Sequence, residues 1–79
     1  MRVVVTGLPD DITEEQVKEA LGKFAPVDAI KLHKDSGAPT AVIEMEMTPT
    51  QADKLVRRIE GRIYKGRKLG AWVPLGGWN

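Results

Sequence analysis

The sequence predicts an α+β fold in which two helices cover one face of a four-stranded antiparallel sheet. Its 79 residues are enough for one domain and too few for two. Two segments repeat apolar residues at helical spacing, and four short segments are β-branched or alternate between apolar and polar residues. Their order along the chain is β-α-β-β-α-β. We assign residues 1–74 to this domain and residues 75–79 to a short C-terminal tail.

The first strand is predicted over residues 2–6 and the first helix from Thr13 onward. Residues 2–6 are mostly β-branched, and the Gly-Leu-Pro-Asp sequence that follows is typical of a turn. Thr13 and Gln16 have the spacing of a capping box, which begins a helix, and Pro26 is expected to end it. The apolar stripe of this helix consists of Val17, Ala20, Leu21 and Phe24.

The second and third strands are predicted over residues 27–34 and 40–47, which alternate in character. The loop between them is rich in Gly, Pro, Ser and Asp, residues that favour turns. The side chains expected to face the core are Ile30, Leu32, Ala41, Ile43, Met45 and Met47.

The second helix begins at another capping box, formed by Thr48 and Gln51, and Gly61 is suited to a left-handed C-cap. Residues 62–67 are predicted to be a connector, and residues 68–73 alternate and make the last strand. The apolar stripe of the helix consists of Ala52, Leu55, Val56 and Ile59.

Two amphipathic helices in this order bury their stripes against one sheet face in the split βαβ arrangement, the ferredoxin-like sandwich. The opposite face of the sheet, which we call the open face, stays in contact with solvent and explains the alternation of the strands. The side chains expected on the open face are Arg2, Val4, Thr6, Lys31, His33, Thr40, Val42, Glu44, Lys68 and Trp72.

Composition excludes several kinds of function. The chain has no cysteine, and its one histidine, His33, has no carboxylate cluster nearby in the sequence, so we expect no disulfide, metal site or cofactor. No apolar run approaches the ~18 residues of a membrane span. No triad order, phosphate loop or dinucleotide fingerprint is present, so the sequence predicts a binding module and not an enzyme.

The formal net charge of +1 hides an uneven distribution of charge. Residues 1–30 carry six acidic and three basic side chains, whereas residues 31–79 carry nine basic and five acidic ones. The segment 54–68 contains seven basic side chains and one acidic side chain. Such a cluster is typical of a protein that binds a polyanion, although a solvated helix face gives the same pattern.

With these elements placed, residues 2–73 resemble the RNA recognition motif family. The similarity rests on residues 3–9 as the first strand motif, residues 41–45 as the end of the third strand motif, and residues 66–69 before the last strand. The resemblance implies single-stranded RNA as the partner and the open face as the binding surface. The positions that stack bases in this family correspond to Val4, Thr40 and Val42, none of which is aromatic.

Trp72 can replace the missing aromatic platform, because alternation places it on the open face near basic residues that would meet phosphates. The residues expected to assist it are Arg2, Lys31, His33, Arg67 and Lys68, with Arg62 and Lys65 nearby. The alternative is that Trp72 is half buried under the tail and covers Val4 and Val42. Trp78 either adds a second ring or belongs to a mobile tail.

Two classes of function remain open. The first is RNA or single-stranded nucleic-acid binding by a monomeric intracellular protein, either cytoplasmic or nuclear. The second is protein–protein interaction through the non-aromatic open face or the helix face, since relatives without stacking aromatics often bind peptides. Residues 67–69 resemble the Arg-X-Phe element of such relatives, with leucine in place of phenylalanine. An acylphosphatase-like hydrolase would need an asparagine beside a phosphate loop, and the one asparagine is Asn79.

Overall fold

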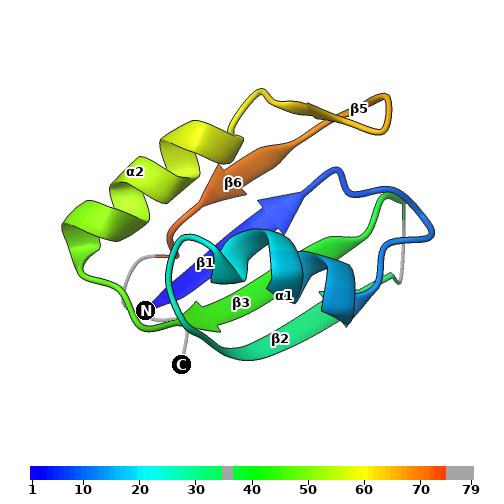
Figure 1. Cartoon of the computed structure of the whole chain (residues 1–79). Coiled ribbons are helices and arrows are strands. Elements are labelled where there is room, and N and C mark those ends of the chain that lie inside the picture. The colour runs from blue at the N-terminus through cyan, green and yellow to red at the C-terminus, as the bar shows by residue number, and fades with distance from the viewer. Residues whose placement is uncertain (35–36, 75–79) are drawn as a thin grey trace.

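The computed structural model describes residues 1–34 and 37–74, and the predicted element order is confirmed with one additional hairpin (Figure 1). The elements are strand β1 (Arg2–Thr6), helix α1 (Glu14–Gly22), strands β2 (Val27–His33) and β3 (Thr40–Met45), helix α2 (Pro49–Ile59), and the short strands β4 (Ile63–Tyr64), β5 (Arg67–Lys68) and β6 (Gly70–Trp72). The pair β4–β5 forms a separate two-stranded hairpin between α2 and the last strand of the main sheet.

The main sheet is antiparallel and has the strand order β2-β3-β1-β6. Both helices lie across the same face of this sheet, as Figure 1 shows. This arrangement is the ferredoxin-like α+β fold predicted from the sequence, and it leaves the second face of the sheet without a covering helix.

The hydrophobic core fills the space between the helices and the inner face of the sheet. Val3, Ile43 and Met45 are fully buried there, and each such side chain contributes about 1.5–3 kcal/mol through removal from water. The helices contribute Val17, Leu21, Leu55 and Ile59 to the same cluster. Ile30 and Leu32 pack against it from β2, so the predicted inward faces of the strands are confirmed.

Both helices begin at the predicted capping boxes. The Gln16 backbone N–H donates to the Thr13 hydroxyl at 3.2 Å, and the Thr13 N–H donates to the Gln16 side-chain oxygen at 3.0 Å. Thr48 and Gln51 repeat this exchange at the start of α2. These bonds satisfy backbone donors that have no partner within the helix.

Helix α1 ends at Gly22, so the prediction that it continues to Pro26 was wrong. Pro26 disfavours helical conformation only at Ala25, whereas the helix already ends at Gly22, a residue type that is unfavourable within helices. The Phe24 and Ala25 N–H groups both donate to the Leu21 carbonyl and close a tight final turn. Phe24 packs against the core from this turn and not from the helix.

The last strand of the main sheet is shorter than predicted. It begins at Gly70, and the expected connector over residues 62–67 together with Lys68 forms the hairpin instead. The Leu69 N–H donates to the Arg62 carbonyl, and the Leu69 carbonyl accepts from the Gly61 N–H. The chain thus exchanges one pairing partner for another at Leu69, because residues 67–69 pair with 61–64 whereas β6 pairs with β1.

Two close contacts fix the position of this last segment. The Ala71 N–H donates to Glu60 Oε2 at 2.9 Å, which ties the end of α2 to β6. Gly7 has a φ of +79°, and a Cβ placed on it would lie 2.4 Å from the Lys68 carbonyl oxygen. Glycine is therefore required where the turn after β1 meets the end of the hairpin.

Candidate nucleic-acid interface

A row of four side chains crosses the open face from one edge of the sheet to the other. Lys31 on β2 lies opposite Val42 on β3, Val42 lies opposite Val4 on β1, and Val4 lies opposite Trp72 on β6. Residues directly opposite each other in antiparallel strands share a face, so these four form one line. We call them the platform row. It places a cation at one end and an indole ring at the other.

The two central valines of the platform row are less accessible than its ends. Val4 is 1% exposed although it lies outside the core cluster on the helix side, and Val42 is half-buried. Trp72 is 46% exposed. The accessible members of the row are therefore Trp72, the half-buried Val42 and the exposed Lys31, and the buried Val4 lies between Val42 and Trp72.

The neighbouring positions on the open face are polar. His33 lies opposite Thr40 at one side of the platform row, and His33 is exposed while Thr40 is half-buried. At the other side Arg2 lies opposite Glu44, and the Arg2 Nε donates to Glu44 Oε2 at 2.7 Å. The structure thus brings seven of the nine predicted site residues together on one face.

The remaining two predicted site residues, Arg67 and Lys68, lie elsewhere. They form β5 of the hairpin, so the expectation that Lys68 belongs to the last strand of the open face was wrong. Both side chains are exposed. They precede Gly70 on the same run of chain that carries Trp72, so the hairpin continues from the Gly70 end of β6 (Figure 1).

The hairpin holds features that sequence reasoning missed. Lys65 and Gly66 form its two-residue turn with φ values of +49° and +81°, the signature of a type I′ turn. The Lys65 Nζ lies 5.6 Å from the centroid of the Tyr64 ring, and Ile63 is 66% exposed. The signal that could have revealed the hairpin is the Lys-Gly pair between two short segments of alternating character.

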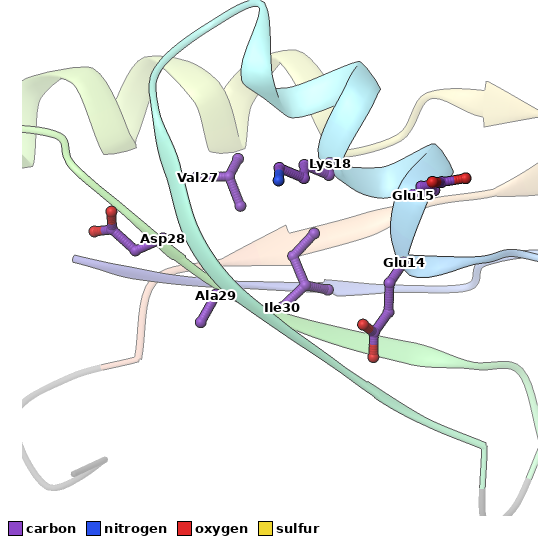
Figure 2. A pocket seen from close by; sticks show the side chains of 7 residues that line it. All are labelled: Glu14, Glu15, Lys18, Val27, Asp28, Ala29 and Ile30. Atoms are coloured by element: carbon purple, nitrogen blue, oxygen red, sulfur yellow. The ribbon is translucent and has the colours of Figure 1, made fainter.

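The opposite edge of the molecule is acidic. A pocket of about 280 Å³ lies between the start of α1 and β2, and Figure 2 shows the side chains around it, with Lys18 extending toward Val27. Its charged side chains are Glu14, Glu15, Asp28 and Lys18. Three carboxylates against one ammonium disfavour a phosphate in this pocket, which lies between β2 and α1.

A second cavity, of about 120 Å³, lies on the helix side of the sheet. Its walls are apolar and come from α1, the end of α2, the turn after β1, and the hairpin. Ala20, which was expected in the core, is exposed at this cavity. Tyr64 and Leu69 close it from the hairpin side.

Within residues 1–34 and 37–74, no group of three or more His, Asp or Glu side chains is placed to hold a metal ion. None of the helices in the described chain is long and apolar enough to cross a membrane. The predictions for Trp78 and for a tail that covers Trp72 fall on residues 75–79, which lie outside the described residues.

Several solved structures are similar to this chain. A structure of the Rna15 RRM with bound RNA (GU) is 26% identical, with a TM-score of 0.78, and the match covers 94% of this chain and 82% of that chain. The C-terminal RNA recognition motif of the U11/U12 65K protein is 18% identical, with a TM-score of 0.81 and coverage of 99% and 72%. An RNA binding protein called PG1 is 22% identical, with a TM-score of 0.78 and coverage of 95% and 94%.

The similarity is also present at the level of sequence. A comparison with curated proteins gives no significant match. The model of the RNA recognition motif family matches residues 3–70, which include every strand of the main sheet up to the start of β6. The chain therefore belongs to the RNA recognition motif family.

Proposed function

We propose that this protein binds single-stranded RNA through its open face, with Trp72 as the stacking surface. The observation that carries this proposal is the platform row, in which an exposed indole stands where alternation and register bring it level with Val42 and Lys31. An aromatic ring stacks on any base, and nearby cations contact the phosphates on either side. One exposed aromatic on the row suits a contact with one base.

The charge distribution supports the same partner. Lys31 and His33 lie on the open face, and the hairpin that leads into β6 carries the exposed Arg67 and Lys68. The acidic pocket beside α1 leaves that edge unfavourable for phosphates. The Rna15 RRM, which is similar over most of this chain, was solved with bound RNA, and this adds weight to an RNA partner here.

We infer binding and not catalysis. On the open face the carboxylate of Glu44 is paired with Arg2, and the residues opposite it on β1 and β2 are Arg2 and Ala29, neither of which is an acid–base partner for a carboxylate. We also propose that residues 1–74 form a monomeric domain and that residues 75–79 are a tail. An RNA partner further implies a place inside the cell, in the cytoplasm or nucleus.

A titration with short single-stranded RNA tests this function. The NMR chemical shifts of backbone amides on β1, β3 and β6 around Trp72 should change on addition of RNA at low salt. The changes should be smaller at moderate salt, because binding through phosphate contacts releases counterions and is weaker when the salt concentration is higher. Shifts confined to the helix side, or no shifts at low salt, would show that the open face is not an RNA surface.

The apolar cavity on the helix side favours a second candidate, recognition of a peptide side chain. The cavity is lined by apolar residues, while the hairpin beside it carries four exposed cations, so an acidic peptide with one large apolar residue would fit. Such a peptide should shift the amides of Ala20, Tyr64 and Leu69 and leave Trp72 unchanged. The variant Tyr64→Glu, which places a charge at the cavity, should abolish those shifts if the peptide binds there.

A further inference from the structure

The ion pair between Arg2 and Glu44 lies next to the platform row. Val4 lies opposite Trp72, and Arg2 is two residues before Val4 on the same face, so Arg2 and Trp72 are diagonal neighbours across β1 and β6. Glu44 lies opposite Arg2 on β3. The Arg2 and Glu44 side chains are 39% and 40% exposed, so both are accessible to a molecule on this face.

The ion pair holds the Glu44 carboxylate in one orientation. The Arg2 Nε donates to Oε2 at 2.7 Å, and in the part of the chain that the structure describes no other group donates to Glu44. A carboxylate accepts hydrogen bonds at both oxygens, and each oxygen has two lone pairs. Glu44 is thus a fixed, half-exposed acceptor whose charge is offset by Arg2.

A carboxylate opposes phosphates, so on a surface that binds RNA its favourable partners are the N–H groups of base edges. Carboxylates accept hydrogen bonds from the amino groups of bases, and proteins that bind single-stranded RNA read the Watson–Crick edges of unpaired bases. Guanine presents two adjacent donors on this edge, N1–H and the N2 amino group, which match the two oxygens of a carboxylate. Adenine and cytosine present a ring acceptor beside their amino group, and uracil presents one N–H between two carbonyls.

The spacing of the sheet favours a purine. Trp72 on β6 and Glu44 on β3 are separated by two strand intervals across the sheet and by two residues along the strands, so their backbones are about 12 Å apart. The two long side chains narrow this gap from both ends, and a hydrogen bond of ~2.9 Å adds to the reach of a base stacked on Trp72. A pyrimidine is one ring shorter and extends less far toward Glu44 than a purine when it is stacked on Trp72.

We propose that Glu44, oriented by Arg2, recognises the Watson–Crick edge of a guanine stacked on Trp72 and makes this domain prefer guanine at one position of the RNA. This inference rests on the proposed function, because the base must first stack on the open face. Trp72 contributes binding affinity for any base, and Glu44 makes the affinity for guanine higher than that for the other bases.

The test uses four heptamers of uridine that differ only in the central base, titrated against the full chain by fluorescence anisotropy. The expected result is about tenfold tighter binding of the guanine heptamer, within the range of a good bidentate base contact. The variant Glu44→Gln keeps the shape and removes one acceptor and the charge. It should reduce the guanine preference to threefold or less while it leaves binding of all-uridine RNA unchanged or stronger.

The matched control is Glu46→Gln, which removes the same charge from an exposed position beyond the end of β3. It should leave the guanine preference unchanged. The carboxyl carbon shift of Glu44 gives a second readout, since it should move on addition of the guanine heptamer and not on addition of the all-uridine heptamer.

The outcomes separate this inference from the proposed function. Equal binding of all four heptamers, weakened in each case by Trp72→Ala, would overturn the role of Glu44 and leave RNA binding in place. A guanine preference that survives in Glu44→Gln would likewise overturn it. No binding of any heptamer at low salt would overturn both.

Discussion

Val4 and Trp72 lie directly opposite each other on β1 and β6, yet Val4 is 1% exposed and Trp72 is 46% exposed. The family-typical stacking position on β1 is thus occupied by a side chain that solvent hardly reaches, while its partner on the edge strand is accessible. The accessible aromatic surface of this row lies on the last strand of the sheet.

Replacement of Trp72 by alanine should weaken RNA binding by roughly 1–3 kcal/mol, the usual value of one stacked base. The measurement is a titration of wild-type and variant protein with the same RNA, with thermal denaturation to confirm that the variant folds. Trp72→Phe keeps an aromatic face and should retain most of the affinity. An unchanged dissociation constant in Trp72→Ala would remove the stacking proposal.

Replacement of Lys31 by glutamine should lower the salt dependence of RNA binding. A single phosphate contact contributes about 0.7 to the slope of log affinity against log salt for single strands. We expect the slope to fall by about that amount, as measured by titration at several salt concentrations. Lys18→Gln removes a cation from the acidic pocket and serves as the control, because its slope should equal that of the wild type. Equal slopes for the Lys31 variant and the wild type would exclude a phosphate contact there.

Replacement of Lys65 by asparagine should stabilise the fold and weaken RNA binding. A residue with a side chain loses about 1 kcal/mol or more in left-handed conformation, and asparagine tolerates this conformation better than lysine. The contact of Lys65 with the Tyr64 ring contributes about 0.5 kcal/mol at an exposed site, and its loss offsets part of the gain.

Chemical denaturation and RNA titration of the Lys65→Asn variant measure both effects. A protein that is more stable and binds more weakly cannot owe its weaker binding to misfolding. A loss of stability would show that the turn does not strain Lys65, and unchanged affinity would show that its charge does not contact the RNA.

Replacement of Gly7 by alanine should destabilise the protein by at least ~1 kcal/mol from the left-handed backbone alone. The added Cβ would also lie 2.4 Å from the Lys68 carbonyl oxygen, so the turn or the hairpin must move. Gly22→Ala is the matched control, since nothing lies within 4 Å of its Cβ position and it is in helical conformation. That change should raise stability by up to ~1 kcal/mol in the same denaturation experiment.

Local sequence signals predicted the elements whose ends are set locally. The capping boxes at Thr13 and Thr48 gave the helix starts, because their hydrogen bonds involve residues three positions apart. Alternation placed Trp72 on the open face, and the register with Val4 confirms that position. Whether Trp72 binds a base stays a prediction.

Features that depend on contacts between distant segments could not be predicted. Lys68 was expected in the last strand because residues 68–73 alternate, but Leu69 pairs backward with Arg62, and the sheet takes up the chain only at Gly70. The pairing of Arg2 with Glu44 depends on the register of β1 against β3. Alternation does not fix this register, because a shift by two or four residues leaves every side chain on the same face.

The hydrogen bond from the Ala71 N–H to Glu60 has a consequence for the fate of the protein at high concentration. In an antiparallel strand the N–H groups point alternately toward the partner strand and away from it, and the Ala71 N–H points away from β1, since it donates to Glu60. Glu60 occupies that donor, so a strand from another molecule finds a carboxylate where it would need a free amide. Strand pairing between molecules, to which an exposed sheet edge is prone, is thereby disfavoured at β6 by the side chain of Glu60, the C-cap residue of α2.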